Sequence, residues 1–361
     1  MTTAIQPDRR RGRGAVSNTS GRFEAQTREI VDDGWESAAD LPPLPVEITE
    51  EACRSIIARN ASPDLPFDRS INPYRGCEHG CIYCFARPSH AYLGLSPGLD
   101  FETKLTVKPN AAALLRKALD TPGYTPATIA LGANTDPYQP IERDHGTTRE
   151  IVETLLAYRH PFCITTKSAL VTRDIDLLRE AAALGIVRVA LSVTTLDHRL
   201  SRVMEPRCSA PHARFRAMET LAAAGVPVMA MTAPMIPALN DHEMEKLLET
   251  ARDAGATSAG YVALRLPREI ATLFREWLEE HYPDRAARIL GHIRTMHGGK
   301  DYDAQWGKRM TGSGPYAQLM AARFKTAIAR LGLTKGRMGQ RADLFRPPPR
   351  VGDQFDLFAQ E

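Results

Sequence analysis

The sequence predicts an α/β protein built on a partial parallel barrel of six β/α units, a (β/α)6 barrel of the TIM type. Between Ser70 and Leu266, apolar strand-like segments alternate with amphipathic helical ones. The strand-like segments are apolar on both faces, as buried parallel strands are. A complete eight-unit barrel takes about 250 residues, so this segment is too short for one.

The expected elements follow one another in strict order along the chain. The expected strands are Ile71–Arg75, Ala127–Ala133, Phe162–Thr166, Val187–Val193, Val226–Ala233 and Ser258–Leu264. The helices between them are Ala111–Leu119, Thr148–Tyr158, Asp174–Leu184, Pro211–Ala224 and Asp241–Ala254. Asp174 and Asp241 occupy N-cap positions, and Gly185, Gly225 and Gly255 follow helix ends.

The flanks differ in composition from this core. Residues 1–65 contain an arginine cluster and an acidic, proline-marked stretch, so we expect a disordered or extended segment there. Residues 66–266 form the predicted core barrel, 267–340 a helical basic extension and 341–361 a flexible tail. The helices expected in the extension are Pro267–Glu280, Asp284–Met296 and Pro315–Leu331.

The composition restricts the class of protein. Its 361 residues carry a formal net charge of +3, with 43% hydrophobic and 25% charged residues, as in ordinary globular proteins. The apolar runs are far shorter than the ~20 residues of a membrane span. Met1–Arg13 contains no apolar signal region, so we expect a cytoplasmic protein without membrane contact.

Three of the six cysteines lie close together directly after the first expected strand. Cys77, Cys81 and Cys84 have the spacing Cys-x3-Cys-x2-Cys. Three thiolates on one short loop can reach three corners of a [4Fe–4S] cluster and leave the fourth iron open to a small molecule.

Two other metal sites remain possible from the spacing. A structural zinc ion needs four ligands, and His79, His90 or the distant Cys53 could supply the fourth. An ordinary ferredoxin cluster needs a fourth cysteine and a Cys-x2-Cys-x2-Cys spacing, which this loop lacks.

The cysteine spacing, its position after the first strand and the six β/α units resemble the radical S-adenosylmethionine (SAM) superfamily. Within it, the resemblance is to the branch of spore photoproduct lyase, and it extends to Asn134–Glu142, Thr166–Ser168 and Leu191–Val193. The resemblance implies a [4Fe–4S] cluster and SAM, which is cleaved reductively to a 5′-deoxyadenosyl radical. It also implies an electron donor such as flavodoxin or ferredoxin.

The same resemblance assigns side chains to SAM. The methionyl amino group would lie near Asn134, Thr135 or Asp136, the carboxylate near Lys167 and Ser192, and the adenine near Tyr83 and Phe85. Each position also has an ordinary interpretation. Asp136 before Pro137 could be a turn residue, Lys167 a solvated lysine, and Ser192 a strand serine bonded to backbone.

The sequence departs from the lyase where that enzyme returns a hydrogen atom to the thymine dimer. The lyase uses a cysteine near the second-strand loop, and Gly132–Asp136 contains none. Tyr83 matches one tyrosine of the lyase relay, but Phe85 has no hydroxyl group. We therefore take Tyr83 and Cys208 as the candidate catalytic residues, and Cys163 as an ordinary buried thiol.

Two features near the C-terminus suggest partners. Residues 294–350 contain 12 Lys and Arg against 3 Asp and Glu, with interleaved aromatic residues, as DNA-binding surfaces do, although a solvated helical face would look the same. Gln354–Phe358 resembles peptides that dock on the bacterial sliding clamp, with Gln354 in a polar subsite and Leu357 and Phe358 as the apolar anchor. A similar Gln340–Phe345 could instead pack on the barrel.

Together these features favour a lyase-like radical SAM enzyme of DNA or nucleotide repair or modification. One alternative is a radical SAM enzyme that modifies a peptide, an RNA or a metabolite. Another is a cluster-bearing electron carrier or redox sensor that is not an enzyme.

Overall fold

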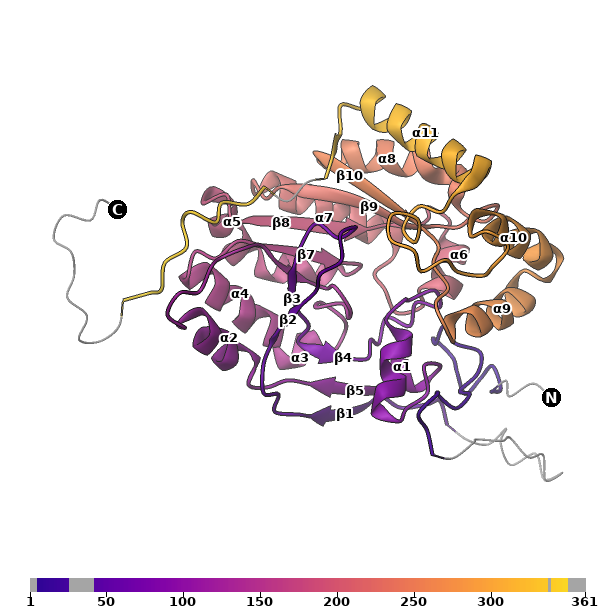
Figure 1. Ribbon diagram of the computed structural model, residues 1–361, viewed down its shortest axis with the longest axis horizontal. Coiled ribbons are helices and arrows are strands. Elements are labelled where there is room, and N and C mark those ends of the chain that lie inside the picture. The colour runs from indigo at the N-terminus through magenta and orange to yellow at the C-terminus, as the bar shows by residue number, and fades with distance from the viewer. Residues whose placement is uncertain (1–4, 26–41, 337–338, 350–361) are drawn as a thin grey trace.

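The predicted partial barrel forms the centre of the molecule. The computed structural model describes residues 5–25, 42–336 and 339–349. Its larger sheet has eight strands in the order β11-β10-β9-β8-β7-β6-β3-β2 (Figure 1). The six parallel barrel strands are β3 (Arg69–Ile71), β6 (Ile129–Leu131), β7 (Phe162–Thr166), β8 (Val187–Ser192), β9 (Val228–Met235) and β10 (Ser258–Ala263).

Helices connect successive strands and cover the outer face of the sheet, as right-handed crossovers of parallel strands do. They are α2 (Ala111–Leu119), α4 (Thr147–Ala157), α5 (Ile175–Ala183), α7 (Pro211–Ala223) and α8 (Met244–Asp253). The main core lies between these helices and the strands, with Ile164, Val189 and Leu191 fully buried. Shorter elements complete the connections: α3 (Glu142–His145), α6 (His198–Met204), η2 (Ala169–Asp174) and η3 (Asp241–Glu243).

The two expected aspartate caps have other partners. The carboxylate of Asp174 does not cap α5, and it accepts bonds from Tyr138, Arg149 and Arg173 instead. Asp241 begins η3, and its carboxylate accepts a bond of 2.6 Å from the hydroxyl of Tyr316. Both carboxylates therefore connect separate elements of the fold, and neither accepts a hydrogen bond from the free backbone amides at the start of its helix.

The first expected strand is divided in two. β3 ends at Ile71, and after a bend β4 (Tyr74–Arg75) pairs antiparallel with β5 (Lys104–Val107), which pairs parallel with β1 (Glu47–Glu50). Between β4 and β5 lie η1 (Arg87–Leu93) and α1 (Asp100–Thr103). The cysteine loop therefore starts from this small sheet.

The N-terminal segment was expected to be disordered or extended, and disorder does not hold for its described parts. The backbone amides of Gly14 and Ala15 donate to the buried carboxylate of Glu102 at 2.9 and 2.8 Å. Further along, β2 (Ile57–Arg59) pairs antiparallel with β3. Composition misled the prediction because these polar groups bond to partners far away in the sequence.

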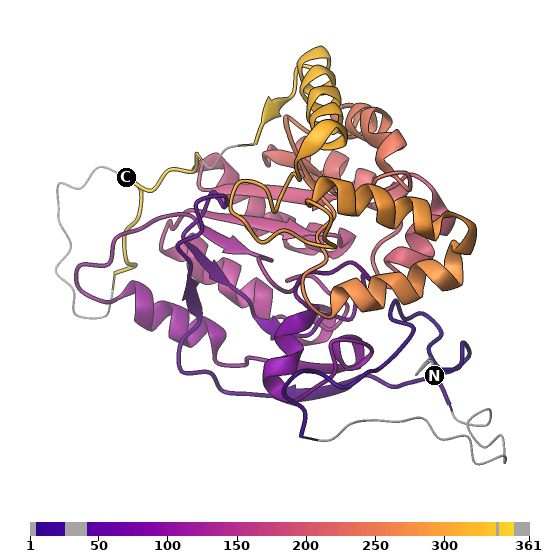
Figure 2. The same ribbon diagram turned by 45° about the vertical axis from the view of Figure 1, so that its right-hand side comes forward.

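The C-terminal extension contains the three expected helices, α9 (Ile270–His281), α10 (Pro283–Met296) and α11 (Gly314–Arg330). Figure 2 shows α9 and α10 side by side, and α11 packs along α8, where Arg323 binds Glu245 at 2.6 Å. β11 (Thr334–Lys335) then joins β10 at the edge of the sheet. Among the residues described, no helix has the length and apolar character that crossing a membrane requires.

The first part of the expected flexible tail packs on the barrel. The ring of Phe345 lies 5.4 Å from that of Tyr124 and 5.5 Å from that of His160, and the amide of Arg346 donates to the carbonyl of Tyr158. Of the two interpretations of Gln340–Phe345, packing on the barrel is the one observed. Gln354–Phe358 lies outside the described residues.

Candidate functional site

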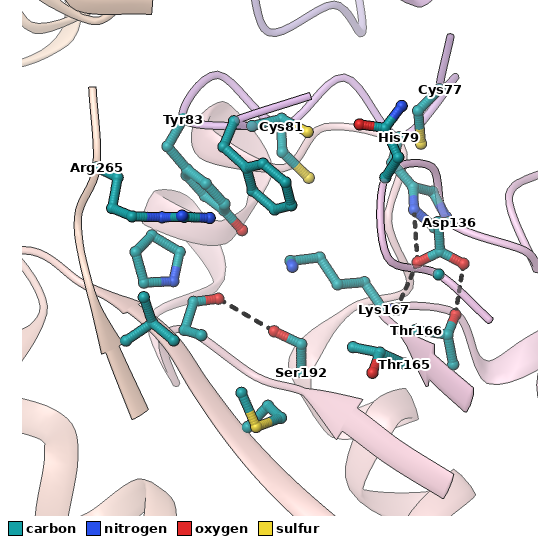
Figure 3. A pocket seen from close by; sticks show the side chains of 18 of the residues that line it. Cys77, His79, Cys81, Tyr83, Asp136, Thr165, Thr166, Lys167, Ser192 and Arg265 are labelled. Carbon is teal, nitrogen blue, oxygen red and sulfur yellow. Dashed lines mark hydrogen bonds and ion pairs between the residues drawn. The ribbon is translucent and has the colours of Figure 1, made fainter. Parts of the chain in front are cut away.

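A pocket opens where the barrel strands end, and the cysteine loop forms one of its walls (Figure 3). The carboxyl ends of parallel strands are the usual location of active sites in barrels. The loop contributes Cys77, His79, Cys81, Tyr83, Cys84 and Phe85. The strand ends contribute Gly132, Asn134, Asp136, Thr165, Thr166, Lys167, Ser192, Met231, Ala233, Pro234, Val262, Ala263, Leu264 and Arg265.

Two glycines allow the cysteine loop to bend closely against α1 and β5. Gly76 and Gly80 have φ angles of +71° and +68°, which favour glycine. A Cβ at Gly80 would lie 2.7 Å from an oxygen of Glu102, and one at Gly76 2.7 Å from Leu105. The buried Arg87 donates to the carbonyls of Gly80 and Cys81 and holds the bend in place.

All three thiols of the loop are free and lie on the same wall. The neighbouring Cys208 thiol lowers the pKa of Cys81 to about 7, and the Lys167 ammonium acts in the same direction. Burial raises the pKa of Cys84 to about 12. Soft thiol donors on a closely bent loop fit an iron–sulfur cluster.

Two of the three side chains considered as a fourth zinc ligand lie elsewhere. Cys53 bonds to Asn110, and Nε2 of His90 lies 3.0 Å from the carbonyl of Lys104; neither residue lines the pocket. The third, His79, lines the pocket and is paired with Asp136. As placed, no three His, Cys, Asp or Glu side chains of the described residues could hold a single metal ion.

Asp136 connects the cysteine loop to β7. It accepts bonds from the hydroxyl of Thr166 at 2.6 Å and the amide of Lys167 at 2.8 Å, and it lies 3.3 Å from Nδ1 of His79. Although burial opposes its charge, His79 and these bonds lower the pKa of Asp136 to about 2. Asp136 also accepts a hydrogen bond from the backbone amide of Tyr138, so the interpretation of Asp136 as a turn residue holds as well.

Lys167 points into the pocket, so the interpretation as a solvated surface lysine is wrong. Its Nζ lies 5.5 Å from the centre of the Tyr83 ring (Figure 3). Burial opposes its charge, but the charges of Cys81 and Glu205 raise the pKa of Lys167 overall. A buried, charged amine at this position can bind a carboxylate.

Behind Tyr83 lies a buried carboxylate that the sequence analysis missed. The hydroxyl of Tyr83 donates to Glu205, which also accepts bonds from Thr194 at 2.9 Å and Arg214 at 2.5 Å. Burial and the nearby charges of Cys81 and Glu205 raise the pKa of Tyr83. The phenol therefore stays protonated and keeps a hydrogen atom beside the pocket.

The remaining predicted residues divide into two groups. Asn134, Phe85 and Ser192 line the pocket, and the hydroxyl of Ser192 donates to the carbonyl of Ala233 at 3.1 Å, as its ordinary interpretation expected. Thr135 and Cys208 do not line it. The hydroxyl of Thr135 donates at 3.1 Å to the carbonyl of Tyr74.

Cys208 lies beside the cysteine loop, with its Sγ 3.5 Å from the Sγ of Cys81. Backbone bonds hold the two segments together, from Ile82 to the carbonyl of Met204 and from Arg207 to that of His79. Cys208 therefore contacts an expected cluster ligand and not the cavity itself.

Arg265 lines the pocket, and the sequence analysis did not consider it. It follows the last barrel strand, and the rule that placed Lys167 and Ser192 at strand ends could have found it. Glu205 carried no comparable signal, because its partners come from three separate segments.

Comparisons with known proteins identify the family of this chain. Residues 71–251 match the family model of the radical SAM superfamily. An uncharacterized protein of Mycobacterium tuberculosis is 40% identical over 243 residues, which cover 66% of this chain and 71% of that protein. An uncharacterized protein of Methanocaldococcus jannaschii is 29% identical over 214 residues, which cover 59% of this chain and 76% of that protein.

Solved structures share the fold. Spore photoproduct lyase complexed with dinucleoside spore photoproduct superposes with a TM-score of 0.59 at 15% identity, over 80% of this chain and 81% of that chain. A mutant of the lyase with bound AdoMet and dinucleoside spore photoproduct superposes with a TM-score of 0.59 at 15% sequence identity. The match covers 82% of this chain and 87% of that chain. With the family model matching half of the chain, the protein belongs to the radical SAM superfamily, and its cofactors are a [4Fe–4S] cluster and SAM.

Proposed function

We propose that this radical SAM enzyme acts on DNA or nucleotides, in a lyase-like repair or modification reaction in the cytoplasm. The observation that carries the proposal is the location of the basic extension beside the pocket. The loop between α10 and α11 bonds to the end of β10, where the amide of Ala263 donates to the carbonyl of Met310 at 2.8 Å. This loop carries Lys300 and Lys308, and its Trp306 is 60% exposed, as base stacking requires.

Part of the basic segment has a structural use. Arg294 binds Asp301, Arg309 binds Asp64 and Arg323 binds Glu245. For those three arginines, the pairs favour the alternative that the basic segment is a solvated helical face and not a DNA-binding surface. Of the other cations, Lys300 and Lys308 lie in the loop beside the pocket, and Lys325, Arg330 and Lys335 lie on α11 and β11.

In this proposal Cys77, Cys81 and Cys84, which line the pocket, would hold the cluster. When bound, the reduced cluster supplies the electron that cleaves SAM to methionine and a 5′-deoxyadenosyl radical. Lys167 binds the methionyl carboxylate by a charge-assisted hydrogen bond. The side-chain amide oxygen of Asn134 accepts a hydrogen bond from the methionyl amino group. Asp136 keeps Lys167 and His79 in position.

Tyr83 is the candidate hydrogen-atom donor to the substrate. It borders the pocket, and its protonated hydroxyl donates a hydrogen bond to Glu205. Gly132–Asp136 has no cysteine, so the donor chain differs from that expected of a spore photoproduct lyase. Cys208 could restore the hydrogen of Tyr83 only through the buried groups behind the pocket.

The test is formation of 5′-deoxyadenosine by anaerobically reconstituted protein with reductant and SAM, with and without UV-irradiated DNA. We expect the rate to rise with irradiated DNA, and alanine at Cys77 to abolish it. Formation that is indifferent to DNA would refute the nucleic-acid substrate and favour a peptide or metabolite. An intact cluster that forms no 5′-deoxyadenosine would favour an electron carrier.

Two partners belong to the same proposal. A low-potential donor such as flavodoxin or ferredoxin reduces the cluster. Gln354, Leu357 and Phe358 dock the C-terminus on the sliding clamp, so alanine at Leu357 and Phe358 should abolish clamp binding in a pull-down and leave SAM cleavage unchanged. Undiminished binding of that variant would refute the docking.

A further inference from the structure

We propose that Arg265 binds a phosphodiester group of the substrate at the mouth of the pocket. This inference rests on the proposed nucleic-acid substrate and names the group that is recognised. It concerns a residue that no SAM contact requires.

Backbone bonds of the two residues before Arg265 set its position. Leu264 donates its amide to the carbonyl of Met235 at 3.0 Å, and Ala263 bonds to Met310 in the basic loop. The guanidinium carbon lies 4.5 Å from the centre of the Phe85 ring. A guanidinium group stacked on an aromatic face keeps the N–H groups along its edge free to bind a ligand.

Arg265 has no carboxylate partner among the residues that the structure describes. Asp64 lies nearby, but both its oxygens bind Arg309, at 2.7 and 2.5 Å. Burial lowers the pKa of Arg265, although Tyr302, Asp64 and Cys84 act in the opposite direction. Such a group gains most from an anion that arrives with the ligand.

The pocket thus contains two cations, Lys167 and Arg265, above two aromatic rings of the cysteine loop. The methionyl carboxylate of SAM accounts for one of them. The other cation is available for an anionic group of the substrate, and the fork of a guanidinium matches two oxygens of a phosphate.

The surroundings favour a phosphodiester over a carboxylate. Phe85 is 46% exposed beside Arg265, and Trp306 on the adjoining loop is 60% exposed. Exposed aromatic faces next to a phosphate-binding cation are the arrangement by which proteins hold unpaired bases.

The test compares two probes that differ by one charge. The cluster-loaded protein with SAM is titrated anaerobically, by calorimetry, with thymidylyl-thymidine and with its methylphosphonate-linked analogue, which is neutral. We expect the wild type to bind the charged probe about tenfold more tightly, a difference of about 1.4 kcal/mol. Arg265→Gln should lose this preference, and Arg265→Lys should keep part of it.

Arg216→Gln is the matched control, because Arg216 is exposed on α7 and does not line the pocket. If Arg265→Gln retains the preference, or if the wild type binds both probes equally, the role of Arg265 is refuted while the nucleic-acid substrate stands. If the wild type binds neither probe, both proposals fail. Iron content and 5′-deoxyadenosine formed without substrate, measured on each variant, identify loss of folding.

Discussion

Replacing Glu102 by glutamine should destabilise the fold around the cysteine loop. Oε1 of Glu102 accepts bonds from the amide of Ala15 at 2.8 Å and from Arg87 at 2.6 Å, and Oε2 accepts the amide of Gly14 at 2.9 Å. Glutamine replaces one oxygen with an amide group that only donates. In either orientation, a donor then faces another donor in a buried site, and Arg87 loses its counter-charge.

Breaking a buried ion pair by removing one partner costs about 3–5 kcal/mol. Arg87 keeps its bonds to the carbonyls of Gly80, Cys81, Pro97 and Gly98, so we expect the lower end of that range. At about 2.1 cal/mol/K per residue, the unfolding entropy of the chain is about 0.8 kcal/mol/K. The Tm should therefore fall by about 4 °C.

The measurement is urea and thermal unfolding followed by circular dichroism, together with the rate of tryptic cleavage after Arg13, which should rise as the N-terminal segment detaches. Glu153→Gln is the control, because Glu153 is 49% exposed and its pair with Arg149 belongs to the class of surface pairs worth about 0–1 kcal/mol. Equal losses in the two variants would show that the bonds to Glu102 do not hold the loop.

Three further predictions follow from the site and the core. In cluster-free protein, oxidised glutathione should form a disulfide between Cys81 and Cys208, whose sulfurs are 3.5 Å apart; peptide mapping that finds Cys81 paired elsewhere would contradict this, and Cys208→Ser should prevent it. Burial lowers the pKa of His160 to about 4, so on acidification the imidazole takes up a proton in the unfolded chain before it does so in the folded protein. The free energy of unfolding should therefore fall between pH 6.5 and about 4. His160→Gln should flatten that pH dependence in urea titrations, and an unchanged slope would exclude His160 as its source. Cys77→Ala should lose bound iron after reconstitution while Cys163→Ala, within β7, should retain it; equal iron in both would refute the ligand assignment.

Local pattern alone was enough for the barrel, and the resemblance to a family supplied its cofactor class. The expected strand Phe162–Thr166 has the observed bounds, and so does the helix Ala111–Leu119. Both are short, apolar or amphipathic segments with a clear period, which burial against the sheet stabilises. The three cysteines lie within eight positions, so the sequence itself brings them to one loop.

The tertiary structure decided the features whose partners are distant along the chain. Residues 5–25 appear unable to order themselves by composition, yet Gly14 and Ala15 bond to Glu102, more than eighty residues away. Arg265 and Phe85 meet because the last strand and the first loop of a partial barrel open on the same pocket. A sequence specifies which groups are available, but the closure of the chain determines which of them are neutralised inside the protein and which remain free for a ligand.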